Sequence, residues 1–107
     1  MLYKVLFVED SREMQDAVAL ALKKECDFTL ACSNGEARSC LDKAGFDLVL
    51  VDLTLPDGDG FKICNHIRQT DALRQIPIIF MTGRAEIEDK EMAFSIGADD
   101  YLSLIHI

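Results

Sequence analysis

The sequence predicts a single α/β domain built around a doubly wound parallel sheet. Segments with strand-like and helix-like hydrophobic spacing alternate along the whole chain, which is the pattern of successive βαβ units. No linker, repeat or low-complexity stretch interrupts this alternation. Because 107 residues suffice for one hydrophobic core, we expect residues 1–107 to form one domain.

Five apolar segments have the composition of strands. We expect them at residues 2–8, 28–32, 48–52, 78–82 and 101–107. The third is a continuous apolar run from Leu48 to Val51 that ends in Asp52, so both of its faces should be covered. Pro77 introduces the fourth strand.

Four segments between these strands have apolar residues at helical spacing. The first helix should begin after Asp10 or Ser11 as its N-cap. Its apolar stripe comprises Met14, Ala17, Val18, Ala21 and Leu22. The second should open on the capping-box sequence at 33–36, and the third should span 61–69. The fourth should run from about 87 to 96 and stop at Gly97. A doubly wound sheet of this kind then lacks its final helix.

Charge and composition exclude several classes of function. The chain has 11 basic and 19 acidic residues, a net charge of -8 and no Lys/Arg cluster, so we expect no direct nucleic-acid binding. No apolar run approaches the roughly 20 residues of a membrane span, and the N-terminus lacks a signal-peptide pattern. The four cysteines form no close pair and are accompanied by two histidines, which argues against zinc. We therefore expect a cytoplasmic protein with no membrane contact.

Two strand ends carry the acidic residues that point to function. Glu9 and Asp10 follow the first strand and Asp52 ends the third, and the carboxyl ends of parallel strands share one edge of a sheet. Three carboxylates in one site repel each other unless a cation is present, and an oxygen-only ligand set with room for water suits Mg²⁺. Asp10 alone is equally well explained as a helix N-cap.

In such a site Asp52 would act as a nucleophile, because a carboxylate can accept a phosphoryl group as a mixed anhydride. The Thr54 carbonyl could complete the metal shell. Thr82, at the end of the fourth strand, would donate a hydrogen bond to a phosphoryl oxygen, although alone it could equally be a solvated strand end.

Four motifs in order and spacing resemble the receiver domain of bacterial two-component response regulators. They are Glu9-Asp10 after the first strand and the segments at 51–60, 81–84 and 97–102. The resemblance covers residues 1 to about 103. It implies a flavodoxin-like fold with strand order 2-1-3-4-5, and Mg²⁺ held by Asp10, Asp52 and the Thr54 carbonyl, with Glu9 acting largely through water.

The resemblance also implies a signalling role. Asp52 would be phosphorylated by a histidine kinase or phosphotransfer protein, and Thr82 and Tyr101 would form the switch pair. Thr54 and Arg84 lie where the family varies phosphoryl lifetime. The face of the fourth helix and fifth strand would pass the signal to an output domain or a downstream protein. Phe94 is expected either on that face or in the core.

The resemblance breaks near the end of the chain. Receivers carry a lysine at the position of Leu104, which here is followed by Ile105. Losing its charge-assisted contact should cost about 1.5–3 kcal/mol of phosphoryl stabilisation, which would weaken coupling to the switch while phosphorylation survives. We expect residues 104–107 to be a truncation or a non-native tail.

Three rival functions follow from the same residues. A degenerate receiver would act as a phosphorylation-independent interaction module, which Leu104 favours and the intact acidic site opposes. An aspartyl-phosphate phosphatase needs a second acid two residues after the nucleophile, where this chain has Thr54. A flavin site is suggested by fold alone and Glu9 would repel its phosphate. We therefore expect no enzyme beyond self-catalysed phosphoryl transfer to and hydrolysis from Asp52.

Overall fold

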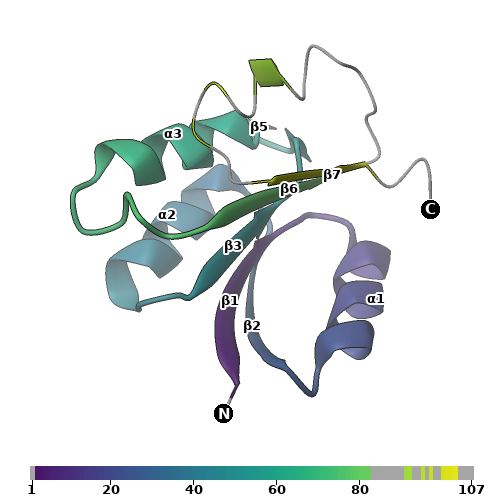
Figure 1. The fold of residues 1–107 in the computed structure, drawn as a ribbon. Coiled ribbons are helices and arrows are strands. Elements are labelled where there is room, and N and C mark those ends of the chain that lie inside the picture. The colour runs from purple at the N-terminus through teal and green to yellow at the C-terminus, as the bar shows by residue number, and fades with distance from the viewer. Residues whose placement is uncertain (1, 83–90, 93–94, 96, 98–99, 104–107) are drawn as a thin grey trace.

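The computed structural model describes residues 2–82, 91, 92, 95, 97 and 100–103, and the following account concerns these residues (Figure 1). Strands and helices alternate along them, as the hydrophobic spacing predicts. In chain order the elements are β1 (Tyr3–Val8), α1 (Arg12–Leu22), β2 (Cys26–Ala31), α2 (Asn34–Lys43), β3 (Leu48–Val51), β4 (Thr54–Leu55), β5 (Gly58–Asp59), α3 (Phe61–Gln69), β6 (Ile78–Thr82) and β7 (Asp100–Ser103).

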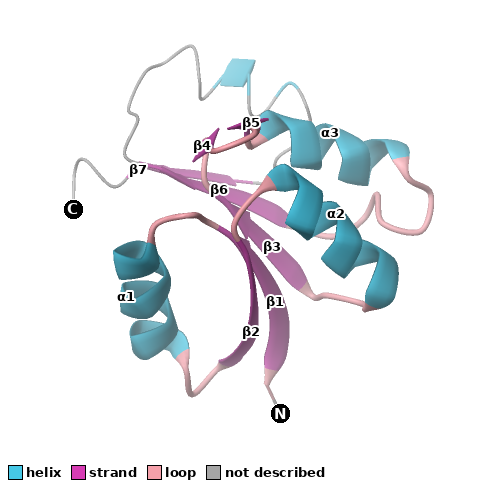
Figure 2. Cartoon of the chain, turned by 180° about the vertical axis from the view of Figure 1, so that it is seen from behind, coloured by secondary structure: helices cyan, strands magenta, loops and turns pink. Residues whose placement is uncertain are grey.

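Five of the strands form one parallel sheet in the order β2-β1-β3-β6-β7. Counted along the chain without the short β4 and β5, this is the predicted order 2-1-3-4-5, and the predicted flavodoxin-like fold is confirmed. Helix α1 lies on one face of the sheet, and α2 and α3 lie on the other (Figures 1 and 2). The sheet is therefore doubly wound.

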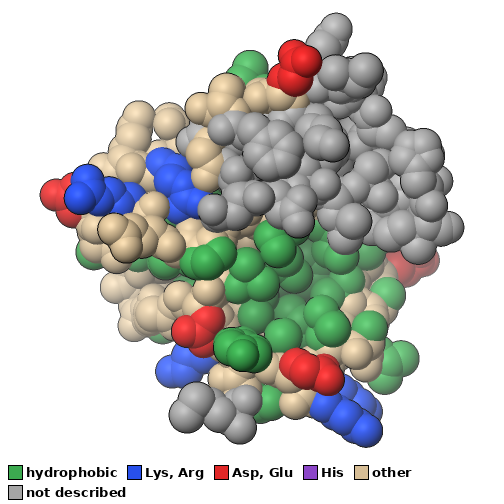
Figure 3. Space-filling model, in the orientation of Figure 1, with side chains coloured by type: hydrophobic (Ala, Val, Ile, Leu, Met, Phe, Trp, Pro, Cys, Tyr) green, Lys and Arg blue, Asp and Glu red, His purple; other side chains and the backbone are tan. Residues whose placement is uncertain are grey.

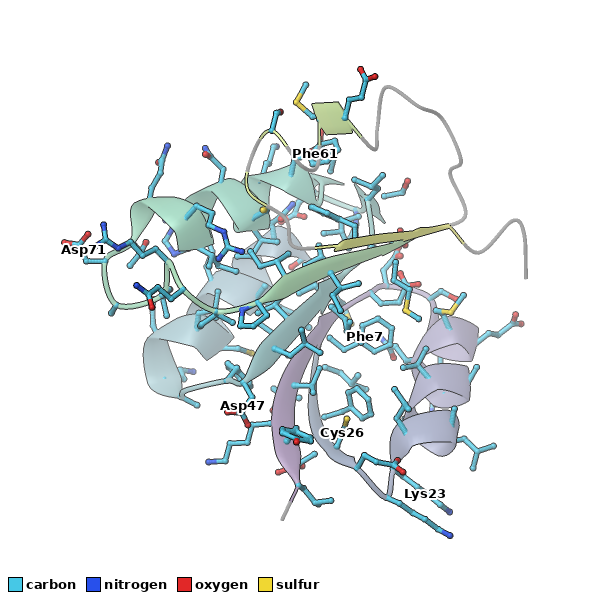
Figure 4. The ribbon with its side chains drawn as sticks, in the orientation of Figure 1. Phe7, Lys23, Cys26, Asp47, Phe61 and Asp71 are labelled. Atoms are coloured by element: carbon cyan, nitrogen blue, oxygen red, sulfur yellow. The ribbon has the colours of Figure 1, made fainter. Side chains whose placement is uncertain are left out.

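Strand β3 lies at the centre of the core. Val49 and Val51 are fully buried on the side of α2 and α3, whereas Leu50 packs in the cluster on the side of α1. Side chains alternate between the faces along a strand, so an unbroken apolar run needs cover on both. Figure 4 shows the same division, with Phe7 between the sheet and α1 and Phe61 on the α3 side.

Two predicted helix starts are confirmed. The Ser11 hydroxyl accepts a hydrogen bond from the Met14 N–H at 3.3 Å, and the Ser33 hydroxyl accepts one from the Glu36 N–H at 3.1 Å. These bonds satisfy N–H groups that have no partner within the first turn. The third helix also has its predicted bounds of 61–69.

Other expectations need correction. Strand β2 begins at Cys26 rather than at residue 28, because it pairs along the whole of β1 from Tyr3. The loop after Asp52 contains the antiparallel hairpin of β4 and β5, which the sequence pattern does not reveal. In α1 only Val18 of the predicted stripe is buried, while Leu22 is 38% exposed, because among the described elements α1 packs mainly against β2.

Residues 91, 92 and 95 are helical, inside the helix expected at 87–96. The remainder of that helix, with Phe94, lies outside the described residues. The last strand is described as Asp100–Ser103, and its expected extension through 104–107 lies outside them as well.

Candidate functional site at the carboxyl edge of the sheet

Three carboxylates meet at the carboxyl edge of the sheet. Glu9 and Asp10 directly follow β1, and Asp52 directly follows its neighbour β3. The sheet hydrogen bonding continues past both strands, because the Glu9 N–H donates to the Ala31 carbonyl and the Asp52 N–H to the Val8 carbonyl, each at 2.9 Å. One oxygen from each carboxylate lies within 4.8 Å of the others. The backbone ladder thus brings together residues that are more than 40 positions apart in sequence.

The carboxylates differ in their exposure to water. Glu9 is buried, with 3% of its surface exposed, Asp52 is half-buried and Asp10 is exposed. Burial is the main cause that raises the pKa of Glu9 to about 8, and the hydrogen bond to Asp52 and the charges of Asp52 and Asp10 contribute to the same rise. In the absence of a cation, Glu9 is therefore largely protonated at neutral pH.

Gln15 is a member of the site that sequence reasoning missed. Its side-chain amide is 8% exposed, donates to the Glu9 carbonyl and lies 3.8 Å from the Cys32 sulfur. This amide ties the first turn of α1 to the residue that follows β1. Gln15 lies between Met14 and Val18 on the side of α1 that faces the sheet. From hydrophobic periodicity alone, a glutamine at this position is interpreted as an ordinary surface residue.

The segment after Asp52 turns back closely over the site. The Thr54 N–H donates to Asp52 Oδ1 at 3.3 Å, and the Gly60 N–H donates to the Leu53 carbonyl at 2.9 Å. A side chain at position 60 would overlap the Asp52 carbonyl oxygen and crowd Val51, so glycine is required for this approach. The Thr54 backbone is consequently held beside the Asp52 carboxylate.

Of the other residues predicted for the site, some are described only in their backbone and the rest lie outside the described residues. Thr82 ends β6, two strands from β1, and Tyr101 belongs to the adjacent β7, where it pairs with Phe80. Arg84 and Leu104 lie outside the described residues. The switch pair and the rate-tuning role of Arg84 therefore stay predictions.

The donor set of this edge fits a hard divalent cation. Within the described part of the chain, Glu9, Asp10 and Asp52 form the one group of three acidic, histidine or cysteine side chains close enough to share an ion. Carboxylate oxygens are ligands that Mg²⁺ prefers, and a cation would offset the carboxylate charges that, after burial, help to raise the pKa of Glu9. The Lys62 ammonium donates a hydrogen bond to the Asp57 carbonyl at 3.2 Å rather than to one of these three carboxylates.

The described surface also has a hollow away from the acidic edge. An open hollow lined by Phe46, Asp47 and Pro77 lies before β3 and β6, at the edge of the sheet opposite to the carboxylates. Its lining includes Asp47 and Asp71, but among the described residues no third acidic, histidine or cysteine side chain joins them closely enough to share an ion. None of the helices in the described residues is long and apolar enough to cross a membrane.

Comparison with known families and proteins agrees with this geometry. The model of the "Response regulator receiver domain" family matches residues 5–103. Regulatory protein VanR from Enterococcus faecium is 39% identical over 102 residues, which cover 94% of this chain and 42% of that protein. This chain therefore spans less than half of the length of that relative.

Solved structures show the same fold. A putative response regulator from Chloroflexus aurantiacus superposes with a TM-score of 0.92 at 28% identity, covering 98% of this chain and 87% of that one. The Mn²⁺-bound form of response regulator Rcp1 superposes with a TM-score of 0.86 at 25% identity, covering 94% of this chain and 80% of that one.

Proposed function

Because this chain belongs to the response regulator receiver domain family, we propose that Asp52 is its phosphoacceptor and that a histidine kinase or phosphotransfer protein is the donor. The observation that carries the proposal is the meeting of the Glu9, Asp10 and Asp52 oxygens within 4.8 Å, with the Thr54 N–H on the Asp52 carboxylate. Asp52 is half-buried, so one side of this group remains accessible to a donor.

The transfer exchanges one bond to phosphorus for another. An Asp52 carboxylate oxygen attacks the phosphorus of a phosphorylated imidazole, an O–P bond forms and the N–P bond breaks, and the imidazole nitrogen keeps the electron pair and takes a proton from water. The product is an acyl phosphate on Asp52. Hydrolysis of the acyl phosphate ends the signal. Water attacks the phosphorus, and Asp52 leaves as a carboxylate with inorganic phosphate as the other product.

The acidic edge would hold Mg²⁺ through Asp10, Asp52 and the Thr54 carbonyl, with Glu9 acting largely through water. The bound ion supplies positive charge that offsets the negative charge of the carboxylates and of the incoming phosphoryl group. The charge of the ion would lower the pKa of Glu9 from its raised value, and the Glu9 carboxylate would then orient water at the site. Gln15 would hold the backbone that carries Glu9 in place.

The response to phosphorylation would start at the neighbouring strands. Thr82 would donate its hydroxyl to a phosphoryl oxygen, and Tyr101 would be the second member of the switch. Phosphorylation adds about -1.5 to -2 charges and three acceptor oxygens, enough to favour one loop arrangement over another. Thr54 and Arg84 would set the phosphoryl lifetime. We place the protein in the cytoplasm, signalling to an output domain or a downstream protein.

Labelling with acetyl phosphate tests the assignment. Wild-type protein should gain one acid-stable but hydroxylamine-labile phosphoryl group in Mg²⁺, and lose this labelling in excess EDTA. Asp52→Asn should abolish it, because an amide is not a nucleophile toward phosphorus at neutral pH. Intact-protein mass spectrometry measures the added mass directly.

Asp27→Asn serves as the matched control, because Asp27 is an exposed carboxylate on β2 and contacts none of the three acidic residues. It should label like the wild type. Labelling that persists in Asp52→Asn would refute the assignment of the phosphoacceptor. Absence of labelling in folded wild type would instead favour the phosphorylation-independent interaction module that Leu104 suggests.

A further inference from the structure

The hairpin that follows Asp52 has a tip that reaches another part of the fold. Strands β4 and β5 pair Leu55 with Gly58, which leaves Pro56 and Asp57 as a two-residue turn. Gly58 has a φ of +132°, a conformation that side chains rarely allow, and a Cβ there would also meet Lys62. The backbone therefore forms a tight turn, and Asp57 lies at the tip of this turn.

Asp57 binds the N-terminus of helix α2. Its Oδ1 accepts hydrogen bonds from the Asn34 N–H at 3.0 Å and the Asn34 side-chain amide at 3.3 Å, and its Oδ2 accepts one from the Gly35 N–H at 3.0 Å. These backbone N–H groups belong to the first turn of the helix, where no partner exists within the helix itself. The bonds hold the pKa of Asp57 below its usual range, so its carboxylate stays charged at neutral pH.

Asn34 fastens both sides of the turn. Its side chain is 5% exposed, and besides contacting Asp57 it donates to the Asp59 carbonyl at 3.0 Å. Asp59 pairs with Thr54 across the hairpin. The contact with α2 therefore fixes the strand that lies directly beside the Thr54 backbone.

At its other end the hairpin meets the acidic site. The Thr54 N–H donates to Asp52 Oδ1 at 3.3 Å, and Leu55 is buried at 6% exposure. Only two residues, Leu55 and Pro56, separate Thr54 from Asp57. A displacement of the tip from α2 would consequently change the position of the Thr54 peptide relative to the Asp52 carboxylate.

We propose that Asp57 is a positioning residue of the acidic site: by binding the N-terminus of α2 through Asn34 and Gly35, it holds the Thr54 backbone beside Asp52 and so sets the affinity for Mg²⁺. This inference rests on the proposed function for the ligand role of Thr54. It makes α2 a support of the site although the helix contributes no ligand. Residues that orient a metal ligand without binding the metal commonly change affinity by about 10- to 100-fold.

Backbone amide chemical shifts provide a test that does not depend on activity. In metal-free protein, Asp57→Ala should move the Thr54 amide resonance, because the hydrogen bond to Asp52 changes, and Mg²⁺ titration should show a Kd roughly tenfold higher than in the wild type. Asp57→Asn keeps one acceptor oxygen and should give a smaller increase in Kd. Asn34→Ala should shift Kd in the same direction as Asp57→Ala.

Ser33→Ala is the matched control, because the Ser33 hydroxyl caps the same helix through the Glu36 N–H but has no hydrogen bond to the hairpin. It should lower the urea midpoint of unfolding and leave both the Thr54 resonance and the Mg²⁺ Kd unchanged. If the Asp57 and Asn34 variants resemble Ser33→Ala in these two readouts, Asp57 is only a helix cap and the proposal is overturned. If wild type shows no saturable Mg²⁺ binding and no labelling of Asp52, the proposed function itself fails.

Discussion

At the scale of single residues, Glu9 is the group whose ionisation the fold changes most. Its pKa is about 8 in the folded protein and about 4.3 in an unfolded chain. Between these values the folded protein binds more protons at this position than the unfolded chain does. The free energy of unfolding should therefore fall as the pH rises through this window, by at most about 1.4 kcal/mol per pH unit.

Glu9→Gln should remove this pH dependence, because the amide cannot ionise while its shape still fills the buried position. We expect urea unfolding in EDTA to show a flatter profile between pH 5 and 8, and a variant more stable than the wild type at pH 8. Asp27→Asn, which alters an exposed carboxylate, should keep the wild-type slope. An unchanged slope in Glu9→Gln would show that another group causes the dependence.

The strand ends Glu9 and Asp52 could be predicted from sequence, since apolar runs end at them and parallel strands align their carboxyl ends. Gln15 could not, because a single glutamine in a helix carries no periodic signal. The role of Asp57 could not be predicted from the sequence for another reason. Its partner Asn34 is 23 residues away, and only the folded chain brings the two together.

At the scale of elements, boundaries were predicted best where a local hydrogen bond defines them. Ser11 and Ser33 cap their helices through side-chain chemistry that the sequence displays directly. Strands β4 and β5 have two residues each, which is too short for alternating hydrophobic and polar residues to be recognised in the sequence. The start of β2 depends on pairing with Tyr3, which is a tertiary contact.

Arg68 joins the end of α3 to two other segments. Its Nε donates to the Gly97 carbonyl at 2.7 Å, and its guanidinium donates to the carbonyls of Arg74 at 2.9 Å and Ile76 at 2.7 Å. A planar guanidinium presents several donors in a fixed arrangement that an ammonium cannot copy. The side chain therefore links α3, the segment before β6 and the residue at position 97.

Arg68→Lys should lower the free energy of unfolding by about 2 kcal/mol, because at least two of these bonds are lost while the charge remains. Chemical denaturation followed by circular dichroism measures the change. Arg38→Lys, on the exposed face of α2, should change stability by less than about 0.5 kcal/mol. Equal effects of the two substitutions would contradict the linking role of Arg68.

At the scale of the whole molecule, the two faces of the sheet are unequal. Among the residues that the structure describes, the cluster on the α2 and α3 side contains most of the fully buried ones, whereas the cluster on the α1 side has four buried members and several half-buried neighbours. Figure 3 views this second face and shows hydrophobic side chains gathered on it. Phe28, Ile79 and Met81 are among the half-buried residues there. The acidic edge is held from both faces, by Gln15 of α1 and by the contact of α2 with Asp57.

If Asp52 is the phosphoacceptor, as we propose, a change at Asp52 must reach β6 and β7, and the residue at position 104 bears on this step. Leu104 stands where the family resemblance implies a lysine. An ammonium there would add a charge-assisted contact to the phosphoryl group, worth about 1.5–3 kcal/mol, whereas leucine offers none. We expect Leu104→Lys to leave Mg²⁺-dependent labelling of Asp52 in place and to increase the conformational response.

The response is measured as the change in amide chemical shifts of β6 and β7 on adding beryllofluoride, a phosphoryl mimic, with Mg²⁺. Leu104→Lys should give larger shifts at Thr82 and Tyr101 than the wild type, and Leu104→Met, which is apolar and similar in size, should resemble the wild type. The added contact favours the phosphorylated arrangement by roughly 10- to 100-fold, which moves a population from a minority to a majority. Equal shifts in all three proteins would mean that position 104 does not limit the coupling between Asp52 and strands β6 and β7.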